Sequence, residues 1–478
     1  MTDPPGSVRA LFPTGRRRKE VSDILTRELV RADKRIAAGP VTPTIDLASF
    51  RRELAAFDFE TAQPLLALLE WTISQLEQGV VHLTHPRYFG LFNPAPTFPA
   101  ECADRIAAAF NPQLATATTS PVAVEIEAHV VRAVARRASF PPDATGHFTT
   151  GGAEANYTAL LCALTRADAR FAIEGARAFD GPPRFYVSRD SHLAWLKIAH
   201  QAGIGRAAVR LVATDGYGRM DPAALLDALA GDRDAGCVPV MIGATAGTTN
   251  AGMIDPLPAC AEIAGSFGLW FHVDAAWGGA VIASERLRGL LQGIEQADSM
   301  TIDAHKWFAT TMGCGIFITK HAAVLSSAFQ VATGYMPSTT RGLDPYLVSV
   351  QWSRRFLGLR LFLSLAAAGW AGYARHVERS IDLIRHLAEN LANRGWRIEN
   401  EPSLGVLCFA PTRQSDGEVR TIVSRVLASG RAWISVAVFE GREVIRACVT
   451  HGGTGRDDII ELVNLLEAAA APDSGLST

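Results

Sequence analysis

Short apolar runs alternate with longer stretches of helical periodicity through the middle of the chain. The apolar runs predict β-strands at 146–149, 184–187, 238–242, 269–273 and 299–302. An Ala/Leu-rich stretch that starts at Ala153 predicts a helix after the first of these strands. Strands that alternate with helices are typical of a mostly parallel sheet covered on both faces. In such sheets ligands bind at the carboxyl ends of the strands.

The two ends of the chain follow other patterns. Helical spacing at 57–79 predicts helices in the N-terminal part, and the proline-rich, aromatic segment His85–Pro96 excludes a regular helix there. A helical stretch at 361–394 leads to alternating apolar runs and a final helix at 456–470. We therefore expect three parts. They are an N-terminal helical segment (1–97), a large α/β domain (98–360) and a small C-terminal α+β domain (361–478).

Composition and charge narrow the class of protein. The 478 residues are 48% hydrophobic and 20% charged, which is typical of soluble globular proteins with a large core. A net charge of -2 provides no basic field for nucleic acid or anionic lipid, and the cluster Arg16–Lys19 reads as a solvated arm. The apolar run 361–374 is too short to span a bilayer. We expect neither a nucleic-acid nor a membrane partner.

The seven cysteines are scattered and form no C-x-x-C pair, so we expect neither a metal site nor a disulfide framework. Their odd number suits a reducing compartment. The polar start Met1–Gly6 lacks the apolar core of a secretory signal. These observations predict a cytoplasmic location.

A lysine lies just beyond the last predicted strand, in the segment Asp303–Trp307. An ordinary exposed lysine is one interpretation of Lys306. A lysine that forms a Schiff base must be partly desolvated, so that its amine can be neutral and attack a carbonyl. The neighbouring Ile302, Trp307 and Phe308 would supply such apolar surroundings.

Asp274 ends the apolar strand at 269–273. Burying a carboxylate is costly unless it has a cationic partner, and a protonated pyridine nitrogen is such a partner. A ring kept positive in this way accepts electrons from a substrate bond. The alternative is that Asp274 caps a helix. The small residues that follow would let a flat ring lie against the backbone: Ala275, Ala276, Gly278 and Gly279.

Three more strand ends carry candidate ligand groups. The glycine pair in Thr150–Asn156 lies between a strand and a helix, where free amides favour a phosphate, although it matches no nucleotide motif. His192 could stack on a planar cofactor or form a loop hydrogen bond, and Thr245–Asn250 could bond cofactor oxygens or form a polar turn. Together with Asp274 and Lys306, this ordered set indicates pyridoxal 5′-phosphate.

With these residues the chain resembles the group II pyridoxal-phosphate-dependent amino-acid decarboxylases, which include aromatic L-amino-acid, glutamate, histidine and cysteine-sulfinate decarboxylases. The resemblance extends from His85 to the end of the chain. Its markers are His85–Phe89, Ser120-Pro121, Glu125–Glu127, Gly151–Asn156, His192, Gly247–Thr249, His272–Ala276, Asp303–Trp307 and Arg354–Phe356. It implies a fold-type I (aspartate-aminotransferase-like) enzyme. It also implies an obligate homodimer with shared active sites and N-terminal helices that wrap the partner.

The resemblance also implies residue roles. Lys306 would form the Schiff base, Asp274 would pair with the ring nitrogen, and His192 and Ala276 would pack on the two ring faces. Asp303 stands where many relatives have asparagine, and an acid near the phosphate would repel it. The remaining expected ligands are Gly152, Ala153, Asp303 and His305 near the phosphate, Thr249 by the ring substituents, and Leu91, Phe92 and Asn93 in the substrate pocket.

A loop tyrosine, contributed across the dimer, protonates the carbanion in decarboxylases of this family. An ungapped alignment from Lys306 assigns this role to Tyr335, in a glycine- and proline-flanked segment. The loop beyond it is a few residues shorter than in aromatic decarboxylases, and a structural tyrosine is the alternative. Relatives that oxidise the amine to an aldehyde often have phenylalanine there.

The resemblance implies decarboxylation of an L-amino acid to its amine and carbon dioxide. Phe92, Pro94 and Trp307 slightly favour an aromatic or other apolar substrate. The alternatives are an oxygen-consuming aldehyde synthase, another fold-type I lyase and an aminotransferase. A non-catalytic relative would be expected to lack Lys306 or Asp274, and both are present.

Overall fold

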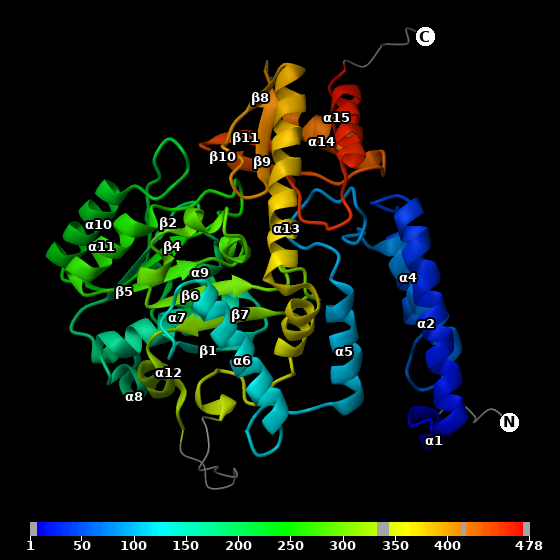
Figure 1. Ribbon diagram of the computed structural model, residues 1–478, viewed down its shortest axis with the longest axis horizontal. Coiled ribbons are helices and arrows are strands. Elements are labelled where there is room, and N and C mark those ends of the chain that lie inside the picture. Colours follow the sequence, from blue (N-terminus) through cyan, green and yellow to red (C-terminus); the bar gives the residue numbers. More distant parts are fainter. Residues whose placement is uncertain (1–6, 332–343, 413–416, 472–478) are drawn as a thin grey trace.

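The computed structural model describes residues 7–331, 344–412 and 417–471. At its centre lies a seven-stranded sheet of order β1-β7-β6-β5-β4-β2-β3 (Figure 1). The strands are β1 (Thr145–Thr149), β2 (Pro183–Ser188), β3 (Val209–Val212), β4 (Val238–Thr245), β5 (Trp270–Asp274), β6 (Ser299–Asp303) and β7 (Gly315–Thr319). Only β7 runs antiparallel to its neighbours, so the predicted mostly parallel sheet is confirmed. The apolar pattern did not predict the edge strand β3 or the antiparallel β7.

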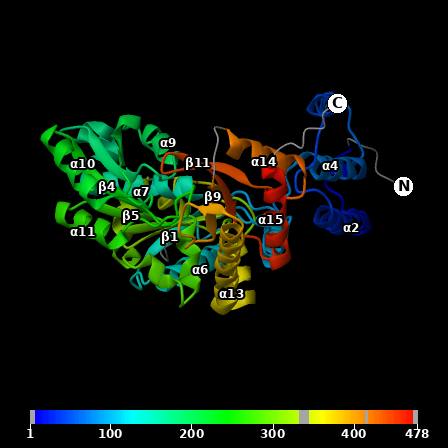
Figure 2. The ribbon, with the colours of Figure 1, turned by 90° about the horizontal axis from the view of Figure 1, so that it is seen from above.

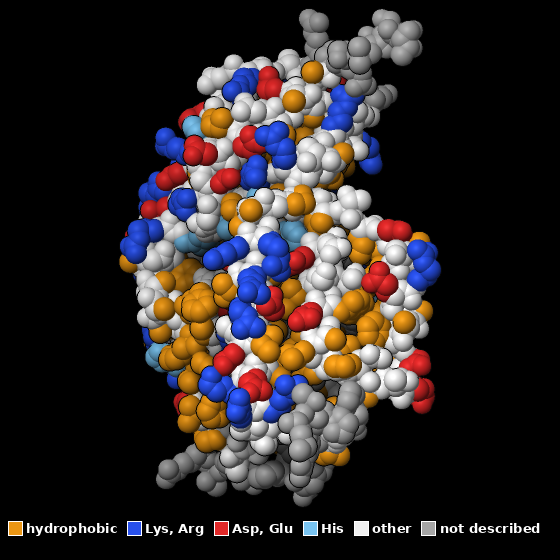
Figure 3. Space-filling model, turned by 90° about the vertical axis from the view of Figure 1, so that its right-hand side faces the viewer, with side chains coloured by type: hydrophobic (Ala, Val, Ile, Leu, Met, Phe, Trp, Pro, Cys, Tyr) orange, Lys and Arg blue, Asp and Glu red, His pale blue; other side chains and the backbone are white. Residues whose placement is uncertain are grey.

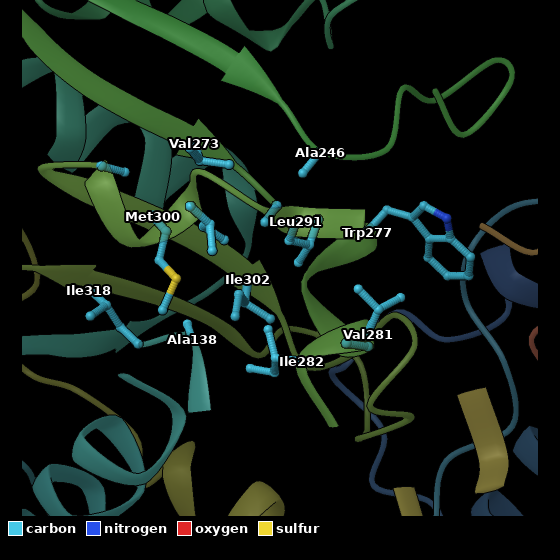
Figure 4. Close-up of a cluster of buried hydrophobic side chains, with 14 of the residues drawn as sticks. Ala138, Ala246, Val273, Trp277, Val281, Ile282, Leu291, Met300, Ile302 and Ile318 are labelled. Atoms are coloured by element: carbon cyan, nitrogen blue, oxygen red, sulfur yellow. The ribbon is translucent and has the colours of Figure 1, made fainter. Parts of the chain in front are cut away.

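Helices cover both faces of this sheet. Side chains alternate across it, so Ile316 and Ile318 of β7 join one core and Phe317 joins the other. Figure 4 shows Val273, Met300, Ile302 and Ile318 of the first core. Helices α6 (Pro121–Arg137), α10 (Pro222–Asp234) and α11 (Leu257–Phe267) cover that core, and α7 (Gly152–Ala167), α9 (Ala194–Gln201) and α12 (Ala322–Phe329) cover the other.

The parallel strands bring the predicted strand-end residues to one edge of the sheet. Thr245 of β4 is paired in register with Asp274 of β5, and Asp274 is paired with Thr301 of β6. Asp303 then ends β6 two residues further on. Acidic and hydroxyl side chains that lie far apart in sequence are therefore neighbours here.

A second, antiparallel sheet of order β10-β11-β9-β8 forms the C-terminal part. Its elements are β8 (Trp396–Ile398), β9 (Val406–Pro411), β10 (Ser435–Phe439), β11 (Arg442–Cys448), α14 (Glu418–Ala428) and α15 (Arg456–Ala470). The final helix has the predicted bounds. The long helix α13 (Gly358–Asn393) connects the two sheets (Figure 1) and crosses the expected domain boundary at 360. Its helical path breaks at Gly369, whose φ of 63° suits glycine.

The N-terminal helices are α1 (Val8–Leu11), α2 (Gly15–Ala38), α3 (Leu47–Ala55), α4 (Leu65–Gly79) and α5 (Phe98–Phe110). The prediction of helix from residue 57 was wrong up to residue 64, because Pro64 disfavours helical backbone in the residue before it. Helices α1, α2 and α4 stand apart from the body in Figures 1 and 2. Across the described ranges, none of the helices has the length and apolar character that a membrane crossing requires.

The segment after α4 is tied to the C-terminal sheet region. The amide of Phe89 donates to the carbonyl of Trp433 at 2.8 Å, and the amide of Cys448 donates to the carbonyl of Phe89 at 2.9 Å. Phe89 is fully buried in the core of the C-terminal part. The segment that leads to Phe92 is therefore held by residues more than 300 positions later in the chain, just before β10 and at the end of β11.

A buried ion pair joins three elements of the large domain. Nη2 of Arg354 lies 2.7 Å from Oε2 of Glu127 on α6, and both side chains are almost fully buried. Oε1 of Glu127 accepts the amide of Gly358 at the start of α13, and Nη1 of Arg354 donates to the carbonyl of Phe148 in β1. Removing one partner would leave the other charge buried without compensation.

We predict that Glu127→Ala lowers the free energy of unfolding by about 3–5 kcal/mol, because it leaves the charged Arg354 guanidinium buried without a carboxylate partner. Denaturant titration followed by circular dichroism measures the change. The control is Glu20→Ala, which removes an exposed ion pair with Arg16 and should cost less than about 1 kcal/mol. Equal losses for the two variants would contradict a special role for the buried pair.

Candidate active site

A cavity of about 280 Å³ opens at the carboxyl edge of the large sheet. It is lined by residues from β5, β6, the start of α7 and the loops after β2 and β4. Every residue predicted near the cofactor lies on it: Gly152, Ala153, His192, Thr249, Asp274, Ala276, Asp303, His305 and Lys306. The topology therefore brings the whole predicted set together.

Asp274 is buried at the end of β5 with 6% of its surface exposed. Its Oδ2 accepts the side-chain amide of Asn156 at 2.7 Å, and its Oδ1 accepts the backbone amide of Ala276 at 3.1 Å. No lysine, arginine or histidine forms an ion pair with it among the described residues. A buried carboxylate that faces a cavity without a cation is suited to a cationic ligand.

The glycine pair lies between β1 and α7, as predicted. A Cβ on Gly152 would lie 3.0 Å from Oδ2 of Asp303 and 3.3 Å from Cβ of Ala276, so the backbone approaches the cavity closely only without a side chain. The first amides of α7 have no acceptor within the helix and point toward its N-terminus. The amides of Gly152 and Ala153 are therefore suited to an anion.

Lys306 follows β6, and its Nζ lies 3.1 Å from Oδ2 of Asp303. Its side chain retains 20% exposure, and Nζ lies 5.6 Å from the centre of the Phe92 ring. His305 Nε2 lies 3.9 Å from the same Asp303 oxygen. Asp303 is thus flanked by two groups that can carry positive charge, which reduces the repulsion expected between an acid and a nearby phosphate.

An aromatic stack forms one wall of the site. The rings of Phe92 and Trp277 are 4.1 Å apart, and those of Trp277 and Trp307 are 4.3 Å apart and nearly parallel. Trp277 donates its indole N–H to the carbonyl of Leu404, and Trp307 donates to Ser380 on α13. The residue next to Lys306 is therefore held by contacts that reach the C-terminal part of the chain.

The expected substrate-pocket residues separate in the structure. Phe92 is 5% exposed and lines the cavity. Leu91 is 46% exposed and Asn93 turns its amide toward the sulfur of Met312, so neither lines this cavity. The assignment of Leu91 and Asn93 to the substrate pocket stays a prediction, and neighbouring side chains in this irregular segment point in different directions. Tyr335 lies outside the described residues.

The sequence reasoning missed Arg446 of β11. Its guanidinium is 2% exposed and lies 4.7 Å from the centre of the Phe92 ring, and it donates to the carbonyls of Thr249 and Gly90. Its Nη2 has no partner among the described residues. The available signal was an arginine inside the apolar run Val444–Cys448. Asn156 and Trp277 line the cavity and lay within or beside quoted motifs without an assigned role.

The comparisons with known proteins agree with this geometry. The model of the pyridoxal-dependent decarboxylase conserved domain matches residues 52–411. The chain belongs to the pyridoxal-dependent decarboxylase family. Tryptophan decarboxylase 1 of Oryza sativa subsp. japonica is 28% identical over 445 residues, which are 87% of this chain and 86% of the relative.

Two mouse proteins are also similar to this decarboxylase. An acidic amino acid decarboxylase of Mus musculus is 31% identical over 348 residues, which are 70% of this chain and 62% of the relative. The crystal structure of mouse CSAD superposes with a TM-score of 0.88 at 26% identity, covering 95% of this chain and 97% of that one. The expected fold-type I architecture is confirmed.

The protein is a carboxy-lyase that acts on an amino acid, and its cofactor is pyridoxal 5′-phosphate. The residues present fit this group on three observations. Asp274 is a buried carboxylate without a cation among the described residues, a Cβ at Gly152 would fill the phosphate cradle, and Lys306 reaches the same cavity. The described chain holds no cluster of three or more His, Cys, Asp or Glu side chains arranged for a metal ion.

Proposed function

We propose that this decarboxylase converts an aromatic or other apolar L-amino acid to its amine and carbon dioxide. The observation that carries the substrate proposal is the wall formed by Phe92 and Trp277 beside Lys306. Flat apolar surfaces of this kind favour aromatic and aliphatic side chains. The relatives include a tryptophan decarboxylase, which supports the same choice.

The chain's own residues have complementary roles in this proposal. Lys306 would hold the cofactor through its amine, and the amides of Gly152 and Ala153 would hold the phosphate. His192 and Ala276 would pack against the ring, and Asp274 would favour the protonated form of its nitrogen. Bound pyridoxal phosphate supplies an electron sink for the pair released as carbon dioxide departs. The walls of the cavity would choose which substrate bond breaks by orienting the substrate.

Arg446 supplies a specific reason for a second candidate. A buried guanidinium with an unpartnered Nη2 can donate hydrogen bonds to a carboxylate of the substrate. That carboxylate is either the α-carboxylate, which all amino acids share, or the side-chain carboxylate of an acidic amino acid. The second possibility would make the substrate an acidic amino acid, as in the mouse relative. A substrate panel separates the two candidates.

Tyr335 is our proposed proton donor to Cα after carbon dioxide leaves. The proposal rests on its position relative to Lys306 and on the family resemblance. Phenylalanine at this position would supply no proton to Cα, and reaction with oxygen would then compete with formation of the amine. That outcome describes the aldehyde synthase alternative.

We propose a homodimer as the working assembly. Exposed apolar side chains gather on the face that carries the N-terminal helices and α5 (Figure 3). Phe12, Phe98 and Phe110 are 73%, 68% and 82% exposed. Apolar surface of this extent is costly in water, and a second copy of the chain would bury it. Helices α1, α2 and α4 stand apart from the body in Figure 1, as expected of an arm that packs on a second copy.

A cytoplasmic location is also proposed. All seven cysteines are free thiols, and a reducing compartment preserves that state. Recovery of the native protein mainly outside the cytoplasm after cell fractionation would overturn this assignment.

We predict that Lys306→Ala abolishes the visible absorption of the lysine-bound cofactor and reduces turnover to background, because no amine remains to attach it. Spectra of the purified variant with added pyridoxal phosphate measure this. The control is Lys320→Ala, which alters a lysine directly after β7 that bonds the carbonyl of Glu295. An unchanged spectrum in Lys306→Ala would refute the assignment.

We predict carbon dioxide and amine in equal amounts from L-tryptophan, L-tyrosine or L-phenylalanine, and much slower turnover of L-glutamate, L-aspartate and L-cysteine sulfinate.

Tyr335→Phe should shift the product toward aldehyde and peroxide, because protonation at Cα slows. Chromatography of products with a peroxide assay measures both. Faster turnover of the acidic set would select the second candidate, and stoichiometric aldehyde from the unmodified enzyme would select the synthase.

The double variant Phe98→Asp/Phe110→Asp should have the mass of one subunit in size-exclusion chromatography with light scattering, because buried charges oppose association. The unmodified protein should have twice that mass. Ile173→Asp is the control, since Ile173 is 91% exposed on the short helix α8 (Phe171–Glu174), on the side away from α5 in Figure 1. A dimeric double variant would remove α5 from the proposed interface.

A further inference from the structure

A hydrogen-bond network runs from Asp274, its near end, into the core beneath the sheet edge, where Trp270 is its far end. Nδ2 of Asn156 lies 2.7 Å from Oδ2 of Asp274, and Oδ1 of Asn156 lies 3.0 Å from Nε2 of His272. Nδ1 of His272 lies 2.8 Å from Oγ of Ser299, which in turn lies 2.8 Å from Nε1 of Trp270. All the members are buried, so water does not compete with these bonds.

The far end of this hydrogen-bond network fits one direction of the protons, in which Oγ of Ser299 accepts from Trp270 and donates to His272. An indole N–H can only donate, so Trp270 donates to Oγ of Ser299. The Ser299 hydroxyl is then free to donate to Nδ1 of His272, and burial lowers the pKa of His272 to about 4, which keeps the ring neutral. A neutral ring that accepts at Nδ1 carries its proton on Nε2.

At the near end of this network, beside Asp274, the hydrogen bonds point in the same direction. Nε2–H of His272 donates to the amide oxygen of Asn156, so the amide nitrogen of Asn156 faces Asp274. If the side-chain amide of Asn156 were turned the other way, its oxygen would face Oδ2 of Asp274. Two oxygens form a hydrogen bond only if one of them carries a proton, so Asp274 would then have to be protonated. Oδ1 of Asp274 is occupied by the backbone amide of Ala276, which also only donates. Thr301 Oγ1 lies further from His272 Nε2, at 3.4 Å.

We propose that Asn156, His272 and Ser299 are positioning residues that hold Asp274 as an unprotonated acceptor for the ring nitrogen of pyridoxal phosphate. This inference rests on the proposed pairing of Asp274 with that nitrogen. Hydrogen bonds from groups that only donate favour the charged form of a carboxylate. His272 contributes by fixing the amide of Asn156, which would otherwise be free to turn its oxygen toward Asp274.

Cofactor affinity with and without the ring nitrogen tests the proposal. The probes are pyridoxal 5′-phosphate and its analogue in which CH replaces the ring nitrogen, titrated into each cofactor-free protein by calorimetry. His272→Phe should weaken binding of the natural cofactor by about 10- to 100-fold, as expected for loss of support to a charged hydrogen bond. It should leave binding of the CH analogue unchanged or tighter, because that ring has no nitrogen to bond.

Two companion variants separate positioning from packing. His272→Gln retains an amide N–H near the position of Nε2 and should recover most of the natural affinity. Ser299→Ala removes a single oxygen two links from Asp274 and should shift affinity in the same direction as His272→Phe, which keeps the test available if the larger change prevents folding. The matched control is His147→Phe in β1, since no bond is present at either ring nitrogen of the buried His147 among the described residues.

The outcomes distinguish this inference from the function it rests on. Equal weakening of both probes by His272→Phe and Ser299→Ala would overturn the positioning role and leave the decarboxylase assignment intact. Equal affinity of the unmodified protein for both probes would instead overturn the pairing of Asp274 with the ring nitrogen. Selective loss for the natural cofactor, with recovery in His272→Gln, supports the proposal.

Discussion

The site depends on one electrostatic constraint, a carboxylate buried at the end of a fully covered strand. Asp274 has 6% of its surface exposed and no cationic partner among the described residues. Two groups that only donate, the amide of Asn156 and the backbone of Ala276, stabilise its charge. The described residues therefore compensate this buried charge only in part, which suits the site to a cationic group such as the ring nitrogen that we propose as its partner.

The other functional groups are positioned relative to this carboxylate by sheet register. Because β4, β5 and β6 are parallel, their carboxyl ends meet at one edge and present Thr245, Asp274 and Asp303 together. Gly152 brings the start of α7 against Asp303 and Ala276, which a side chain would prevent. Asp274, Gly152 and Lys306, the residues that we propose for the ring nitrogen, the phosphate and the Schiff base, thereby line one cavity.

Contacts between distant segments hold these walls in place. The stack of Phe92, Trp277 and Trp307 links the segment before α5 to the residue beside Lys306, and Arg446 packs on Phe92 from the C-terminal sheet. The buried pair of Glu127 and Arg354 anchors the start of α13. The C-terminal part of the chain is therefore joined to the pocket wall through aromatic and ionic contacts.

The sequence by itself determined which strand ends carry the candidate functional residues. Local patterns predict the strands that lead to Asp274 and Lys306, because a parallel strand buried on both faces is a continuous apolar run. The glycine pair before α7 is equally visible in the local sequence. Only the tertiary structure decided which side chains face the cavity. Leu91 points to solvent while its neighbour Phe92 is buried, and Arg446 reaches Phe92 from a strand more than 300 residues away. Irregular segments have no fixed side-chain period, and long-range contacts depend on packing rather than on local sequence.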